Sequence, residues 1–79
     1  MTVRSTVTSM FEEVAREQQR RLAPLTDTLR LVESGLDSLS FALIVARLEE
    51  ALGYDPFDTA ASFPVTFGDF VSLYEKYPR

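Results

Sequence analysis

The chain has 79 residues, of which 46% are hydrophobic; its net charge is −4, and it contains neither cysteine nor histidine. This length allows one small domain, residues 1–79, with a modest core. The charge argues against nucleic-acid binding, which needs basic surface opposite the phosphates, and the missing residue types exclude disulfides, thiolate nucleophiles, cysteine or histidine metal sites and a Ser-His-Asp triad.

The first periodic segment predicts a helix from about residue 5 to about residue 20. Its apolar positions repeat at helical spacing, and charged residues fill the opposite face. The stripe consists of Val7, Met10, Phe11, Val14 and, as its one polar member, Gln18. We expect Ser5 or Thr6 to cap this helix, because a hydroxyl there can accept a hydrogen bond from a free N–H of the first turn.

Residues 21–37 have no helical stripe and predict a long connecting loop, with Pro24 breaking the preceding pattern. Loops of this length are uncommon in small domains and are often functional. Gly35 indicates a backbone turn just before the next helix. We expect the apolar side chains of the loop to point inward and fix it to the core; these are Leu25, Leu29, Leu31, Val32 and Leu36.

The second helix is predicted at about residues 38–52. Its core stripe again has helical spacing and comprises Phe41, Ile44, Val45, Leu48 and Leu52. Asp37 precedes the first turn and is a suitable N-cap. Gly53 follows the last turn, at a position where a left-handed residue commonly ends a helix.

The last third of the chain predicts a short helix at about residues 57–61 and a final helix at about residues 67–77, ended by Pro78. Thr66 with Asp69 three residues later is typical of a capping box. Four residues share one face of the final helix: Phe67, Phe70, Val71 and Tyr74. No strand-like alternation stands out. The sequence therefore predicts an all-α fold, a small bundle of three or four helices with a long loop between the first two.

The segment Glu33-Ser-Gly-Leu-Asp-Ser-Leu39 places Ser38 where the long loop enters the second helix. A serine at a helix start projects into solvent, where a modifying enzyme can reach it. The N-terminus of a helix carries partial positive charge and free N–H groups, so it suits a phosphodiester on that serine. Asp37 is placed to cap the helix and to help bind a metal ion during the modification.

Other segments accompany this motif: the first helix, the long loop, Glu49-Glu50 late in the second helix, and Thr66-Phe-Gly-Asp69. In this combination the chain resembles the acyl carrier proteins over nearly its whole length. The resemblance implies that a phosphopantetheinyl transferase moves a 4′-phosphopantetheine arm from coenzyme A onto Ser38. The thiol of the arm would then hold an acyl cargo as a thioester. It implies a carrier with no catalytic residue and no metal site of its own, served by an acyl-loading ligase and acyl-using enzymes.

The outer face of the second helix departs from the family pattern. Carriers of the fatty-acid type usually have several acids there, whereas the outward positions here read Ser40, Leu43 and Arg47, with Glu50 further on. Leu39, Leu43, Ala46 and Glu50 form a row opposite the core stripe. This face predicts a dedicated partner of a specialised pathway. The residues expected to contact it are Leu39, Leu43, Arg47 and Glu50.

Several alternatives remain open. The cargo is either a fatty or polyketide-like acyl chain, or an amino acid or other polar acyl group loaded by a stand-alone ligase. A helical interaction module with an unmodified Ser38 is the alternative from another class. Leu43 alternatively packs under the loop, and Arg47 is alternatively an ordinary solvated charge.

The sequence also favours a monomer in the cytoplasm without membrane insertion. The N-terminal residues are polar and lack an apolar signal core. The longest apolar run, Phe41–Ala46, is far shorter than the ~20 residues that span a bilayer. Met1 suggests an independent protein and not a slice of a long synthase.

Overall fold

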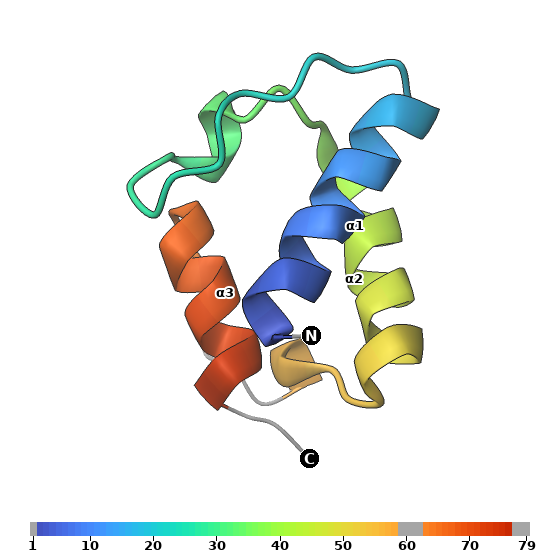
Figure 1. Cartoon of the computed structure of the whole chain (residues 1–79), viewed down its shortest axis with the longest axis vertical. Helices are drawn as coiled ribbons and strands as arrows, with labels where there is room; N and C mark the ends of the chain where they lie inside the picture. The colour runs from blue at the N-terminus through green and yellow to red at the C-terminus, as the bar shows by residue number, and fades with distance from the viewer. Residues whose placement is uncertain (1, 59–62, 77–79) are drawn as a thin grey trace.

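The computed structural model describes residues 2–58 and 63–76 (Figure 1). These residues contain three α-helices: α1 (Val3–Glu17), α2 (Ser38–Leu52) and α3 (Phe67–Lys76). Two short 3₁₀ helices lie in the connections: η1 (Leu31–Glu33) and η2 (Pro56–Asp58). The described residues include no strand, and their only extended pairing is an isolated bridge between Arg30 and Thr66. The predicted all-α class is confirmed.

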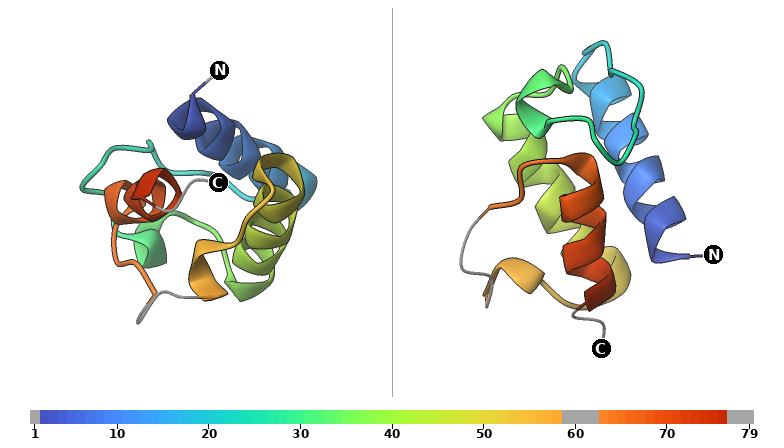
Figure 2. Two further views of the ribbon diagram at one scale, coloured as in Figure 1. Left: turned by 90° about the horizontal axis from the view of Figure 1, so that it is seen from below. Right: turned by 90° about the vertical axis from the view of Figure 1, so that its left-hand side faces the viewer.

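The three helices enclose one core. α1 and α2 run antiparallel to each other, and α1 also packs against α3 (Figures 1 and 2). Phe11 of α1 lies at the centre, with its ring edge-on to the rings of Phe67 and Phe70 at centroid distances of 5.1 Å. This T-shaped arrangement is one that aromatic rings prefer. All four residues predicted on one face of the final helix are buried: Phe67, Phe70, Val71 and Tyr74.

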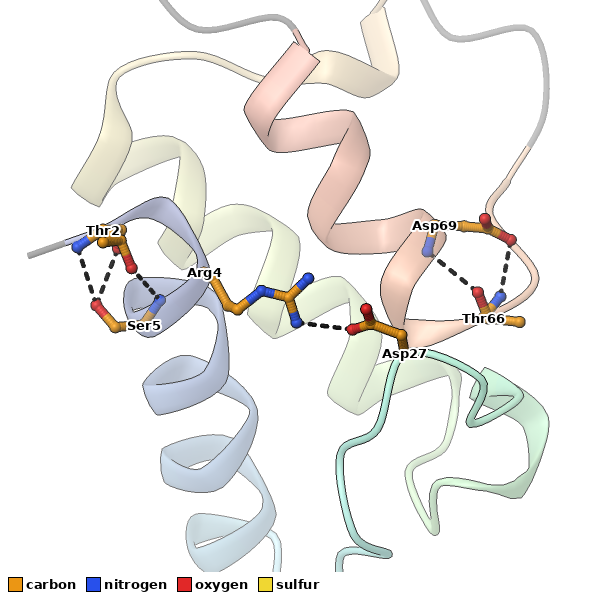
Figure 3. A network of polar contacts seen from close by, with 6 residues as sticks. All are labelled: Thr2, Arg4, Ser5, Asp27, Thr66 and Asp69. Carbon is orange, nitrogen blue, oxygen red and sulfur yellow. Dashed lines mark hydrogen bonds and ion pairs between the residues drawn. The ribbon is translucent and has the colours of Figure 1, made fainter.

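α1 begins earlier than the sequence pattern indicates. Thr2 is its N-cap: the Thr2 hydroxyl accepts a hydrogen bond from the Ser5 N–H (3.0 Å), and the Ser5 hydroxyl accepts one from the Thr2 N–H (3.1 Å) (Figure 3). The prediction of Ser5 or Thr6 as the cap is therefore wrong. The pattern placed the cap directly before the apolar stripe, whereas the polar residues preceding Val7 already form a helical turn.

The other end of α1 also differs from the prediction. Gln19 adopts a left-handed conformation with φ of 56°, and the N–H of Arg20 donates to the carbonyl of Ala15 (2.8 Å). A residue in this conformation commonly ends a helix, because the chain then turns away from the helix axis. α1 consequently ends at Glu17 and not near residue 20.

The long loop is held to the start of α3 by backbone hydrogen bonds. The N–H of Leu31 donates to Val65 (2.8 Å), that of Phe67 to Leu29 (2.8 Å), and that of Gly68 to Asp27 (3.0 Å). We call these contacts between residues 27–31 and 65–68 the loop clamp. A Cβ on Gly68 would lie 2.8 Å from the carbonyl oxygen of Asp27, so the close approach requires glycine.

Side chains reinforce the loop clamp from both sides (Figure 3). The guanidinium of Arg4 in α1 donates to the carboxylate of Asp27 (2.8 Å). At the start of α3 the N–H of Asp69 donates to the Thr66 hydroxyl (3.1 Å), and the N–H of Thr66 donates to the Asp69 carboxylate (3.3 Å). The predicted capping box is confirmed.

The end of the loop contacts the beginning of the loop near Gly35. Gly35 has a φ of 96°, and a Cβ at this position would lie 2.2 Å from the carbonyl oxygen of Arg21, so the predicted glycine turn is confirmed. The N–H of Ala23 donates to Ser34 (2.9 Å) beside it. These contacts bring the end of α1, η1 and the starts of α2 and α3 to one end of the molecule (Figures 1 and 2).

Most apolar residues of the loop point inward as expected. Leu31 and Leu36 are buried, and Leu25 and Leu29 are partly buried against the core. Val32 is the exception, with 80% of its surface exposed, so its predicted inward position is wrong. The physical reason is the 3₁₀ helix η1: successive residues point in different directions, and Leu31 takes the inward one.

α2 has the predicted bounds. The carboxylate of Asp37 caps it, and Gly53, with φ of 86°, ends it. The short helix predicted at 57–61 is the 3₁₀ helix η2 at Pro56–Asp58, and residues 59–61 lie outside the described residues. The predicted end of the last helix at residue 77 and its stop at Pro78 also lie outside them. No helix in the described part of the chain is long and apolar enough to cross a membrane.

Candidate functional site

Ser38 is the first residue of α2, and its side chain is exposed. The loop reaches it through Gly35 and Asp37, both fixed by the contacts above. The first N–H groups of a helix have no partner within the helix, and the aligned peptide dipoles favour negative charge there. The structure thus presents the Ser38 hydroxyl to solvent at a position where a negative substituent is stabilised.

The carboxylate of Asp37 has partners for both of its oxygens. Oδ1 accepts a hydrogen bond from the Ser40 N–H (2.9 Å), and Oδ2 accepts one from the Arg20 guanidinium (2.5 Å). The Ser40 N–H, and to a smaller extent the Arg20 charge, hold the pKa of this carboxyl below its usual range. Asp37 is therefore ionised at neutral pH and fixed at the helix start.

A metal-binding role for Asp37 remains a prediction. Within the described residues no group of three or more acidic side chains could hold a metal ion. A metal ion bound during modification would have to share Oδ2 of Asp37 with Arg20 or displace the guanidinium, because Oδ1 is engaged by the helix cap.

Two apolar hollows meet at Ser38. The first, of about 640 Å³, extends along α2 from Ser38 past Val45 to Glu49, and Phe57 and Phe63 form its other wall. We call it the helix hollow. The second, of about 510 Å³, lies between η1 and residues 63–65, and includes Val32 and Val65 in its wall beside Ser38. We call it the loop hollow.

Phe63 separates these two hollows and contributes to both. Its ring stacks on Phe57 at a centroid distance of 5.4 Å and an interplanar angle of 16°, and meets Phe41 edge-on at 6.1 Å. About half of the Phe63 surface is nevertheless exposed. The aromatic contacts hold an apolar ring close to Ser38.

The side of α2 that faces outward differs from the prediction. Ser40 is fully buried, Leu43 is partly buried against the core, and Arg47 reaches across to α1. The expected outward orientation of Ser40, Leu43 and Arg47 is therefore wrong. The buried face is centred on Ser40, Ile44 and Leu48, which recur every fourth residue, so it is rotated toward α1 relative to the predicted stripe.

The contacts of Arg47 are consistent with this orientation of α2. Its guanidinium donates two hydrogen bonds to the carboxylate of Glu17 in α1 (2.7 and 2.8 Å), and Glu13 lies 3.9 Å away. The alternative of an ordinary solvated charge is also wrong, because bidentate pairing fixes the side chain. The hydrogen bonds from Arg47 lower the pKa of Glu17.

Leu39 and Glu50 are exposed, as expected for partner contacts. Contact of a partner with Leu39, Leu43, Arg47 or Glu50 remains a prediction, but Leu43 and Arg47 are engaged within the chain. Sequence reasoning missed Arg20, Phe63 and Val65. The run Phe63-Pro64-Val65 directly before a capping box was an available signal, whereas no spacing rule connects Arg20 with Asp37.

The arrangement fits a phosphopantetheine arm. Ser38 offers an exposed hydroxyl, the helix start stabilises a phosphodiester, and the adjoining walls are apolar. The family model described as the phosphopantetheine attachment site matches residues 5–62, which include Ser38 and all of α2. No curated protein and no solved structure matches the chain. The chain therefore belongs to the phosphopantetheine-binding acyl carrier family, and is a carrier protein whose cofactor is covalently attached 4′-phosphopantetheine.

Proposed function

We propose that Ser38 is the attachment residue and that the protein carries an acyl group on its arm to partner enzymes. The single observation that carries this proposal is the exposure of Ser38 at the start of α2. The neighbouring serines, Ser34 and Ser40, are fully buried, so a transferase cannot reach them without unfolding the site. Among the other exposed serines that the structure describes, Ser5 has its hydroxyl engaged in the capping box with Thr2, and Ser9 and Ser72 lie further inside helices.

In the proposed transfer, the oxygen of Ser38 forms a bond to the phosphorus that carries the pantetheine of coenzyme A. The bond from this phosphorus to the bridging oxygen breaks, and 3′,5′-adenosine bisphosphate leaves with that oxygen. The serine proton goes to a base of the transferase, because the chain has no histidine or cysteine and Asp37 is engaged. The arm then supplies the thiol that holds the cargo.

The site favours a fatty or polyketide-like acyl chain as the cargo. We place the carrier in a specialised pathway. The helix hollow is lined mainly by apolar side chains, among them Phe41, Val45 and Phe57. Burial of apolar surface in it would stabilise a hydrocarbon cargo, whereas an amino acid or other polar acyl group gains little. The exposed side of α2 next to Ser38 carries no acid before Glu49, unlike carriers of the fatty-acid type.

The protein is expected to serve several partner enzymes as a monomer. A phosphopantetheinyl transferase, an acyl-loading ligase and acyl-using enzymes would each dock around Ser38 and release it, which suits small transient contacts. We infer one carrier domain over residues 1–79, a monomer located in the cytoplasm.

Incubation with coenzyme A and a broad-specificity phosphopantetheinyl transferase tests the proposal. Intact mass spectrometry is expected to show the gain of one phosphopantetheine on the parent protein and none on Ser38→Ala. Ser9→Ala is the matched control, because Ser9 is also exposed and should not matter. A gain on Ser38→Ala, or none on the parent with several transferases, would favour another residue or an unmodified interaction module.

A further inference from the structure

Exposed apolar side chains gather around Ser38. Among the described residues the exposed large hydrophobic side chains are Val32 (80%), Leu39 (59%), Phe63 (52%) and Val65 (61%). Val32, Phe63 and Val65 line the loop hollow together with Ser38, whereas Leu39 lines neither hollow. We call Val32, Phe63 and Val65 the apolar surface. Scattered exposed hydrophobic residues need no explanation, but a contiguous group marks an interaction site.

The apolar surface is formed before any partner arrives. Val65 is joined to η1 through the hydrogen bond from Leu31 to its carbonyl, which is part of the loop clamp. Phe63 is held by its stacking on Phe57. A partner that binds a preformed surface loses little free energy to the ordering of loops and side chains, so a modest apolar contact suffices for transient docking.

The charged residues that line the loop hollow have partners within the chain. Arg30 and Asp37 are the charged residues in the wall of the loop hollow. Arg30 pairs with Glu33 (3.9 Å), and Asp37 pairs with Arg20 (2.5 Å). Glu49 and Glu50 follow Ser38 by about three turns of α2, roughly 17 Å along the helix axis at 1.5 Å per residue. An oppositely charged partner would thus find little free charge beside Ser38.

We propose that the apolar surface docks the transferase that modifies Ser38, against an apolar patch on that enzyme. An enzyme whose active site reaches the Ser38 hydroxyl must cover the residues around it, and all three residues of the apolar surface line the same hollow as the serine. The paired charges imply that docking depends little on ionic strength. This inference rests on the proposed function, because it requires Ser38 to be the modified residue.

Substitution of Val32 or Val65 by a negatively or a positively charged residue tests the inference. We would compare Val32→Glu, Val32→Lys, Val65→Glu and Val65→Lys as substrates of a broad-specificity phosphopantetheinyl transferase. Both residues are largely exposed, so the core is untouched and the melting temperature should match the parent. Each variant is expected to lower kcat/KM about tenfold, mainly through KM, because either charge loses water on docking.

Controls separate apolar from electrostatic docking. Ser9→Glu and Ser9→Lys carry the same charges on an exposed position of α1 outside both hollows, and kcat/KM should stay at the parent value. The parent KM should change less than about twofold between low and high salt, since screening weakens only interactions between charges. The neutral variants Val32→Thr and Val65→Thr, which keep the side-chain shape, should show a smaller loss of the same kind.

Three results would overturn the inference while leaving the proposed function intact. The first is that all four charged variants have the same kcat/KM for arm transfer as the parent. The second is opposite effects of glutamate and lysine, which would indicate electrostatic docking. The third is a dimer of the parent in sedimentation that the variants abolish, which would assign the surface to a second copy. Failure of the parent itself to gain an arm would instead overturn the proposed function.

Discussion

The two flanks of α2 both carry apolar residues but have opposite surroundings. On the flank toward α1, Leu43 packs against the core and Arg47 is tied to Glu17. On the other flank, Ala42, Val45 and Ala46 border the open helix hollow that begins at Ser38. An apolar residue on a helix is therefore structural or available to a partner according to what the rest of the chain places opposite it.

The largest effect should come from a charge on the packed flank. Leu43→Glu is expected to lower the free energy of unfolding by about 2 kcal/mol, because it places a carboxylate against the core. Urea denaturation measures this loss. Ala42→Glu introduces the same charge one residue earlier, on the exposed side, and should change stability by less than about 0.5 kcal/mol. Equal losses would mean that the two flanks do not differ.

A cargo that packs into the helix hollow, on the exposed flank of α2, should change the stability of the protein. An octanoyl thioester on the arm is expected to raise the melting temperature above that of a glycyl thioester, because only the octanoyl chain buries apolar surface in the helix hollow. A gain of about 1 kcal/mol corresponds to a shift of about 4–8 °C in a domain of this size. Thermal denaturation followed by circular dichroism provides the comparison. Equal melting temperatures would contradict an apolar cargo.

The smallest effect should come from the ion pair on the packed flank. Arg47→Gln is expected to reduce stability slightly at neutral pH without changing arm transfer, since exposed ion pairs contribute little. The pKa of Glu17 lies below its ordinary value of 4.5 in the folded protein, so its contribution is present above that value and is lost as pH falls through the folded pKa.

The stabilities of Arg47→Gln and the parent should accordingly converge in acid, below about pH 4.5. Denaturant titrations at pH 7 and near pH 3 test this convergence. Glu12→Gln serves as the comparison, because Glu12 is exposed on α1 and its carboxylate makes no ion pair among the described residues. A stability difference between Arg47→Gln and the parent that persists near pH 3 would point to lost packing of the Arg47 stem.

Local signals predicted the parts of the fold that depend on neighbours in sequence. Asp37 and Gly53 gave the bounds of α2, and Thr66 with Asp69 gave the start of α3, because caps act within one helical turn. The rotation of α2 was missed because it depends on how α2 packs against α1, whose residues are distant in sequence; Arg47 and Glu17, for example, are thirty residues apart. The hydrogen bond from Arg20 to Asp37 was missed for the same reason.

In the candidate site, too, the sequence predicted the residues that depend on local signals and missed those that depend on distant contacts. Ser38 and its helix cap follow from one short segment of sequence. Val65 is held near Ser38 by the loop clamp, and Phe63 by its ring contacts with Phe41 and Phe57. No helical or turn pattern encodes either set of contacts. The outward position of Val32 depends on a 3₁₀ helix that the sequence did not signal.

The loop clamp also affects when a newly synthesised chain can be modified. The family match ends at residue 62, but the partners of Leu29 and Leu31 are Phe67 and Val65. Contacts between residues so far apart in sequence form late, because a long segment must first be closed into a loop. Ser38 would thus leave the ribosome well before the surface around it exists. A newly synthesised chain should become a good transferase substrate only once α3 has emerged and docked.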